Sequence, residues 1–206
     1  MHKVFRRLGL AALFALLAYA VFFAVQTLRP RAIAGPLPEG LLPGDVVLMR
    51  SHTWRAEAVP LIDGVPYRDG FSHVGLVHDR LDDGTYRLVH AVPGSDGTVR
   101  LEPWSFIAQG GGSSEAVVFR APGLSDEARA RLKDLQASAA ARAVPFDSGF
   151  DHHDDSALYC TELVTDLYAK AGHPVVSDAV MDKRAIFPGH FAGSQRLEHV
   201  GGTAPR

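Results

Sequence analysis

One cysteine and two histidines are the residues of this 206-residue chain whose types and positions could do chemistry. Cys160 is the single cysteine, so no second thiol of the chain can pair with it. A lone thiol is either a buried apolar side chain or a thiol kept for its reactivity. A nucleophilic thiol needs a base, and the base needs a polar group that fixes its tautomer and orientation. His73 and His90 have the chemistry for those two roles.

The two histidines lie in the clearest β-hairpin of the sequence. Residues 71–80 and 85–92 alternate between apolar and polar side chains, and Asp82, Asp83 and Gly84 form a turn signal between them. The sequence therefore predicts two antiparallel strands, with Asp82 and Asp83 as a two-residue turn.

The register of this hairpin decides whether the two imidazoles meet. A two-residue turn at Asp82 and Asp83 places His90 opposite Gly75 and on the same face as His73. The two histidines are then diagonal neighbours, roughly 7 to 8 Å apart at Cα, which allows a hydrogen bond between the rings. A shift of one residue would move His90 to the opposite face.

Cys160 is expected near the start of a helix that packs on the sheet. The helix is predicted to begin after the polar run 151–156, with Asp155 or Ser156 as its cap, and to end at Gly172. Free N–H groups at a helix start lower a thiol pKa and can hold an oxyanion. Candidate substrate or oxyanion contacts are the sequence neighbours of the cysteine and the first histidine, Tyr159 and Ser72.

The remaining elements place these residues in an α+β fold. Strands come first and helices later, without regular alternation, which favours an antiparallel sheet covered by helices. The other predicted elements are strands at 46–49, 97–107 (with Trp104 and Phe106 in the core) and 116–120, a short helix at 53–61, and a helix capped by Ser125 with an apolar stripe at Leu124, Ala128, Leu132, Leu135 and Ala139.

An apolar segment near the N-terminus predicts a membrane anchor. Residues 8–25 contain no charged side chain and, at 1.5 Å per residue, just span a hydrocarbon core of about 30 Å. Basic residues precede the segment, which favours a cytoplasmic N-terminus and a periplasmic domain. The predicted division is an anchor at 1–28, a Pro- and Gly-rich linker at 29–43 and a catalytic domain at 44–206.

The same segment has a second interpretation as a cleaved signal peptide. Ala18-Tyr19-Ala20 matches the small-residue pattern of a cleavage site, although apolar residues continue beyond it. A buried core helix fits less well, because the segment has no polar face. Both leading interpretations export the domain, either to the outer surface of the inner membrane or as a secreted protein.

Composition and charge exclude several classes of protein. The chain is 47% hydrophobic and 21% charged, as in folded globular proteins and unlike collagen-like or disordered chains. Residues 1–32 hold five basic residues and no acidic one, which leaves 16 basic against 23 acidic residues in the remainder. Such an acidic domain predicts no nucleic-acid partner.

A run of metal-ligating residue types lies at 151–155, with the sequence Asp-His-His-Asp-Asp. Adjacent loop residues rarely all point at one ion, and neither HExxH nor paired Cys/His spacing is present. A polar loop that caps the following helix is the favoured interpretation. We predict no metal and no cofactor, although a metallohydrolase that uses His152 and His153 is kept as an alternative.

Four motifs resemble a known family. They are LPGDVV at 42–47, FSHVGLV at 71–77, LVHAV at 88–92 and LYCTELV at 158–164. With the histidine first and the cysteine last, they resemble the circularly permuted branch of the NlpC-type papain-like superfamily, the YiiX/YaeF-like group. The segments 187–191 and 197–200 are similar to the closing part of that group, so the resemblance covers roughly residues 40 to 200.

The resemblance implies a papain-like domain in which a helix that starts at the cysteine packs on an antiparallel sheet. It implies that Cys160 is the nucleophile, His73 the general base and acid, and His90 the orienting residue. Relatives of the permuted type often carry a glutamate at the third position, so His90 is a departure from them. Relatives are described as amidases or peptidases, often acting on cell-wall peptides, and some distant kin act on acyl groups of lipids.

The sequence thus predicts a membrane-anchored periplasmic cysteine hydrolase that cleaves an amide or ester through a covalent acyl-enzyme. A peptide of the cell wall is the first expected substrate. The alternatives are a lipid-directed acyl hydrolase or acyltransferase, and a non-catalytic module that binds a peptide or lipid.

Overall fold

A computed structural model of the chain describes residues 17–19, 21, 33–51, 70–93, 96–110, 113–151, 156–183 and 185–203. The chain separates into two units, residues 1–31 and 32–206. Most of the predicted anchor at 8–25 and the whole predicted helix at 53–61 lie outside the described residues. Among the described residues, no helix combines the length and the apolar character needed to cross a bilayer.

The described part of residues 32–206 is built on one six-stranded antiparallel sheet. The strand order is β4-β3-β2-β1-β5-β6, so β2 and β1 occupy the centre. The predicted α+β class with an antiparallel sheet is confirmed. The strands are β1 (Val46–Ser51), β2 (His73–Arg80), β3 (Tyr86–Ala91), β4 (Val99–Pro103), β5 (Ser113–Arg120) and β6 (Glu198–Thr203).

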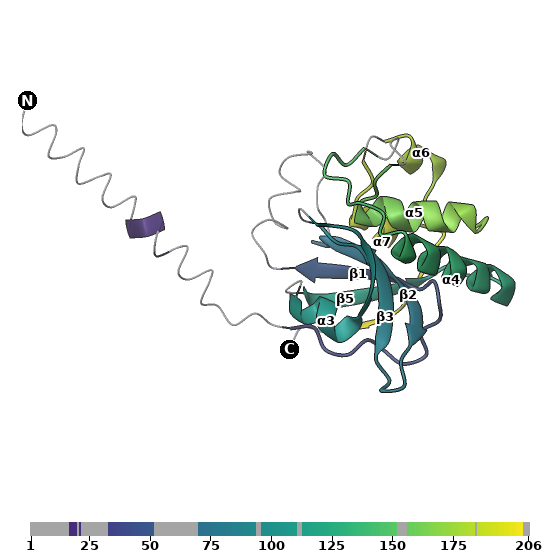
Figure 1. Ribbon diagram of the computed structural model, residues 1–206, viewed down its shortest axis with the longest axis horizontal. Coiled ribbons are helices and arrows are strands. Elements are labelled where there is room, and N and C mark those ends of the chain that lie inside the picture. The colour runs from purple at the N-terminus through teal and green to yellow at the C-terminus, as the bar shows by residue number, and fades with distance from the viewer. Residues whose placement is uncertain are drawn as a thin grey trace, which may run out of the picture. The chain divides into compact units, whose positions relative to one another are not determined.

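Helices cover both faces of the sheet, as Figure 1 shows. One apolar cluster joins one face to α4 and α5 through residues such as Leu48, Val74, Leu132 and Leu163. A second cluster joins the other face to α3 through Met49, Trp104 and others. The helices are α3 (Trp104–Gly110), α4 (Asp126–Ala141), α5 (Cys160–Lys170), α6 (Asp178–Met181) and α7 (Pro188–Ala192).

Two helices begin or extend differently from the sequence prediction. The predicted strand at 97–107 ends at Pro103 and continues as α3, whose helical spacing buries Trp104 but leaves Phe106 60% exposed. Phe106 is therefore not a core residue. Helix α5 begins at Cys160 and not at Asp155 or Ser156, because Tyr159 is extended (φ −91°, ψ 170°) and serves as the N-cap. The Ser125 cap of α4 is confirmed by a hydrogen bond from the Ala128 N–H at 3.2 Å.

The hairpin has the predicted register at the histidines, but its loop differs from the prediction. Its loop has three residues, since the Leu81 N–H bonds to the Thr85 carbonyl and Gly84 takes a φ of 86°. This loop alone would shift the pairing by one residue. A β-bulge at His78 shifts it back, so that Leu76 again pairs with Val89. The predicted two-residue turn is wrong, and the predicted register at the histidines is confirmed.

The buried His78 ring holds the bulge in place. Its Nδ1 lies 2.9 Å from the Gln136 side-chain oxygen on α4, and the Gln136 amide donates to the Val77 carbonyl at 3.4 Å. Each of the two buried side chains therefore has a hydrogen-bond partner inside the core.

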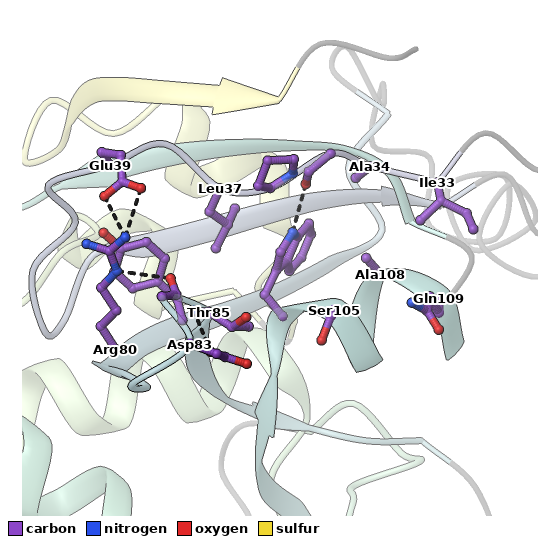
Figure 2. Close-up of a pocket in the computed structure, with 15 residues that line it drawn as sticks. Ile33, Ala34, Leu37, Glu39, Arg80, Asp83, Thr85, Ser105, Ala108 and Gln109 are labelled. Carbon is purple, nitrogen blue, oxygen red and sulfur yellow. Dashed lines mark hydrogen bonds and ion pairs between the residues drawn. The ribbon is translucent and has the colours of Figure 1, made fainter.

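The second half of the predicted linker belongs to the folded unit. Residues 33–42 run beside α3 on the second face of the sheet, where Leu37 and Leu41 are buried and the Trp104 indole donates to the Gly35 carbonyl at 2.9 Å. Pro and Gly content here accompanies an extended packed segment and not a free linker. This segment, the hairpin tip and α3 together line a pocket of about 550 Å³, and Figure 2 shows the pair of Arg80 and Glu39 among the lining residues.

A fully buried carboxylate fastens β1 to its neighbours. Asp45 accepts two hydrogen bonds from Arg120 on β5, at 2.8 and 2.6 Å, and one from the Leu42 N–H at 2.8 Å. Arg129 on α4 lies 3.9 Å away. This network holds the start of β1, and β1 pairs with β2 over Met49 and His73.

We expect Asp45→Ala to lower the free energy of unfolding by about 3 kcal/mol, because it leaves two arginines facing a vacated buried site. Urea unfolding followed by circular dichroism measures the change. Asp134→Ala on the exposed side of α4 is the matched control and should change stability by less than about 0.5 kcal/mol. Equal stability of the two variants would contradict the assigned role of Asp45.

Candidate active site

Three side chains form a hydrogen-bonded chain at the end of the sheet. His73 Nε2 lies 2.9 Å from His90 Nδ1, and His90 Nε2 lies 3.0 Å from a carboxylate oxygen of Glu102. The two rings meet nearly edge to face, with centroids 5.2 Å apart. The predicted contact between the imidazoles is therefore confirmed, while the catalytic roles of these residues stay predictions.

Strand pairing explains why the three side chains meet. β3 and β4 pair with Leu88 opposite Glu102. His90 lies two residues after Leu88 on β3, so Glu102 and His90 are on the same face of the sheet. Gly75 provides room for the His90 ring, since a Cβ added at Gly75 would lie 3.3 Å from the His90 Cβ and 3.0 Å from the Val89 carbonyl. A larger side chain at this point would push the two strands apart.

The Cys160 sulfur lies where α5 begins and β2 starts. The backbone N–H groups of Cys160, Thr161 and Val74 lie near the thiol and act to lower its pKa. The first two are free N–H groups of the first turn of α5. The third belongs to the peptide bond that joins His73 to Val74, so the sulfur lies beside the backbone of the first histidine.

The thiol and the first imidazole are both neutral in the resting protein. Burial raises the pKa of Cys160 to about 11, although the three N–H groups act in the opposite direction. Burial, followed by the neighbouring His90, lowers the pKa of His73 to about 3. The expectation that a helix start lowers the thiol pKa is thus wrong for the net effect, because desolvation of a buried thiolate outweighs the backbone donors.

The Cys160 thiol lies near the backbone of His73, and its hydrogen bonding to the His73 ring is a separate question. In the described part of the chain, no hydrogen bond joins the Cys160 sulfur to a ring nitrogen of His73. His73 Nε2 is the ring nitrogen that is bonded to His90. Both residues are of intermediate exposure.

The two predicted substrate or oxyanion residues occupy different surroundings. The buried Tyr159 hydroxyl accepts a hydrogen bond from the Ile186 N–H at 3.0 Å, and burial raises its pKa to about 12. This contact fastens the segment before α7 to the start of α5. Ser72 precedes β2, and its N–H donates to the Met49 carbonyl at 2.9 Å. A role of either residue in holding an oxyanion stays a prediction.

Glu102 is the member of this cluster that sequence reasoning missed. It lies in a short strand whose pairing partner was not assigned, and no motif marks it. The hydrogen bond from His90 lowers the pKa of the Glu102 carboxyl, and Arg100 lies 3.8 Å away. Aligning the β3 and β4 strands by their apolar residues is the one signal that would have placed Glu102 beside His90.

The acidic and histidine-rich run at 151–155 lies largely outside the described residues, which include only Asp151 of the five. Across the residues that the structure does describe, no group of three or more His, Cys, Asp or Glu side chains is arranged to hold a metal ion.

Comparison with known proteins shows a similarity of fold and not of sequence family. No protein-family model matches the sequence, and no curated protein matches it. The crystal structure of metalloprotein yiiX from Escherichia coli O157:H7 matches with a TM-score of 0.58 and 20% sequence identity, over 78% of this chain and 96% of that one. The chain has a YiiX-like fold. At this identity the likeness concerns the fold, and activity has to be argued from the site.

We expect alkylation of Cys160 by iodoacetamide to become faster as the pH rises toward 11, because burial raises the thiol pKa and the thiolate is the reacting form. The rate is measured from pH 5 to 11 by intact mass. In urea the same profile should shift to the pKa of an ordinary cysteine, about 8.5. A rate in the native protein that is already maximal between pH 5 and 7 would show a resting thiolate–imidazolium pair and contradict this prediction.

The lowered pKa of His73 predicts a loss of stability in acid. Between pH 6.5 and 3 the unfolded chain binds a proton at this residue and the folded chain does not, so stability falls as the pH falls. From pH 6.5 to 4.5 the wild type should lose about 2 kcal/mol more than His73→Gln. Urea unfolding at each pH measures the difference.

The control for this comparison is His199→Gln, which removes an exposed histidine on β6. It should keep the acid loss of the wild type. If His73→Gln loses as much stability in acid as the wild type, the assigned state of His73 is wrong.

Proposed function

We propose that the protein is a cysteine hydrolase that cleaves an amide or ester bond through a thioester intermediate. The observation that carries the proposal is the position of the Cys160 sulfur, which lies against the His73–Val74 peptide at the start of a chain from His73 through His90 to Glu102. A nucleophile, a base and groups that orient the base are what covalent acyl transfer requires. A papain-like, circularly permuted assignment of the YiiX-like fold is part of this proposal.

The reaction proceeds in two halves. The Cys160 sulfur attacks the substrate carbonyl carbon while its proton passes to His73, and the N–H groups at the start of α5 hold the oxyanion. The tetrahedral intermediate collapses, the bond to the leaving nitrogen or oxygen breaks, and His73 returns the proton to the leaving group. Water then attacks the thioester with His73 as the base, which releases the acid and the free thiol.

A neutral Cys160 thiol and a neutral His73 imidazole before the reaction are compatible with these steps. Because the pKa of the thiol is high and that of His73 is low, transfer of the proton is unfavourable before the sulfur attacks a carbonyl. The attack on the carbonyl removes the charge from sulfur and moves it to an oxygen that backbone donors can hold. Activation is thereby tied to the presence of substrate.

The predicted export of the domain supports a substrate in the cell envelope. If residues 8–25 anchor the chain, the site faces the periplasm, where the stem peptides of the cell wall supply amide bonds. Such peptides are the first substrate that we propose. The same anchor would hold the site near lipid head groups, so an acyl chain on a lipid is the second candidate.

The decisive experiment follows the acyl-enzyme directly. The full-length protein in detergent micelles is mixed with p-nitrophenyl acetate, and separately with a synthetic cell-wall stem peptide. We expect a burst of nitrophenolate close to one equivalent of enzyme, and an acetyl adduct on Cys160 by intact mass and peptide mapping. Cys160→Ala should show neither and should retain its circular dichroism spectrum.

Two controls separate this proposal from its rivals. His199→Ala, away from the cluster, should keep the burst, whereas His73→Ala should slow it by about 100-fold or more. The yiiX protein of similar fold is described as a metalloprotein, so the assays are repeated with a chelator. Hydrolysis that survives in Cys160→Ala and stops with the chelator would replace the thiol mechanism with a metal-dependent one. Tight binding of the stem peptide without any turnover would favour a binding module.

A further inference from the structure

Glu102 ends the hydrogen-bonded chain that starts at His73 and passes through His90, so it lies too far along that chain to act on a substrate itself. It faces His90 from the neighbouring strand, with its carboxylate oxygen 3.0 Å from His90 Nε2. Arg100, the other charged side chain beside it, approaches to 3.8 Å. A carboxylate held between an imidazole and a guanidinium stays ionised, and the lowered pKa of Glu102 agrees with this.

An ionised carboxylate accepts hydrogen bonds and cannot donate one. The proton in the contact with His90 therefore resides on His90 Nε2. In its neutral form an imidazole has one N–H and one lone pair, so neutral His90 with its proton on Nε2 has the lone pair on Nδ1. This nitrogen lies 2.9 Å from His73 Nε2. With both rings neutral, it is therefore the acceptor in that contact.

The same argument then applies to the next ring. His73 must carry its proton on Nε2, which leaves the lone pair on Nδ1. With both rings neutral, this is the one arrangement that gives each of the two contacts a single donor and a single acceptor. From this geometry we propose that Glu102 is a positioning residue that, through His90, fixes the tautomer of His73 and so makes Nδ1 the base.

The chain also stabilises the charge that the reaction creates. When His73 accepts the thiol proton on Nδ1, its Nε2–H continues to donate to His90, and the negative charge of Glu102 lies behind that ring. No hydrogen bond has to be rearranged during the transfer. The role in turnover rests on the proposed function, whereas the tautomer of His73 does not depend on any activity.

The test compares Glu102→Ala with Glu102→Gln by nitrogen-15 NMR of histidine-labelled protein. In the wild type at pH 7.5, we expect the His73 ring to show a protonated Nε2 and an unprotonated Nδ1. Glu102→Ala should give a mixture of tautomers at His73. Glu102→Gln, whose amide oxygen can still accept from His90, should retain most of the wild-type pattern.

Kinetics supply the second measurement. Glu102→Ala should lower kcat for p-nitrophenyl acetate by about 10- to 100-fold with little change in KM, and Glu102→Gln should recover part of the loss. The matched control is Glu127→Ala, which removes an exposed carboxylate in the first turn of α4, outside the hydrogen-bonded chain. It should change neither the NMR pattern nor kcat.

The outcomes distinguish this inference from the proposed function. An unchanged His73 tautomer in folded Glu102→Ala overturns the positioning role, even if Cys160 still forms the acyl-enzyme. A shifted tautomer together with full hydrolytic activity in Cys160→Ala upholds the positioning role and overturns the thiol mechanism. Urea unfolding shows whether each variant is folded. If Glu102→Ala is unfolded, the His73 tautomer in Glu102→Gln decides the positioning role.

Discussion

Side chains alternate across a strand, so two rings on neighbouring strands can bond in one register and not in the next. The contact between His73 and His90 exists because β2 and β3 pair with Leu76 opposite Val89. The three-residue loop and the bulge at His78 each displace the pairing by one residue, in opposite directions. Every part of the candidate site that involves these rings depends on that compensation, and the buried contact of His78 with Gln136 holds the bulge in place.

Burial has two effects on the candidate site. It holds the Cys160 sulfur against backbone N–H groups of α5 and β2, and it also removes the water that would stabilise a thiolate. The second effect is larger, so the thiol is neutral, and burial likewise keeps the His73 imidazole neutral. In the proposed mechanism, reactivity depends on what the protein supplies during the attack, namely N–H donors for the oxyanion and an ordered chain of hydrogen bonds behind His73.

The arrangement of helices around the sheet accounts for how the site is supported. Helices α4 and α5 pack on one face, and α3 with residues 33–42 packs on the other, so the central strands are fixed from both sides. The network of Asp45 with Arg120 holds the start of β1, and β1 pairs with the first residues of β2. The likeness to the yiiX structure concerns this framework, and the assignment of chemistry to the three-residue chain rests on its distances.

Local patterns in the sequence determined the strands that carry the histidines, the helix that carries Cys160 and the α+β class, because alternation, caps and glycines act over a few residues. They missed Glu102 and the bulge, and they misplaced the start of α5. These features arise from contacts between distant segments: β4 against β3, α4 against His78, and the buried Tyr159 against Ile186. The net thiol pKa was likewise decided by tertiary structure, since desolvation depends on everything packed around the sulfur and not on its place in the helix.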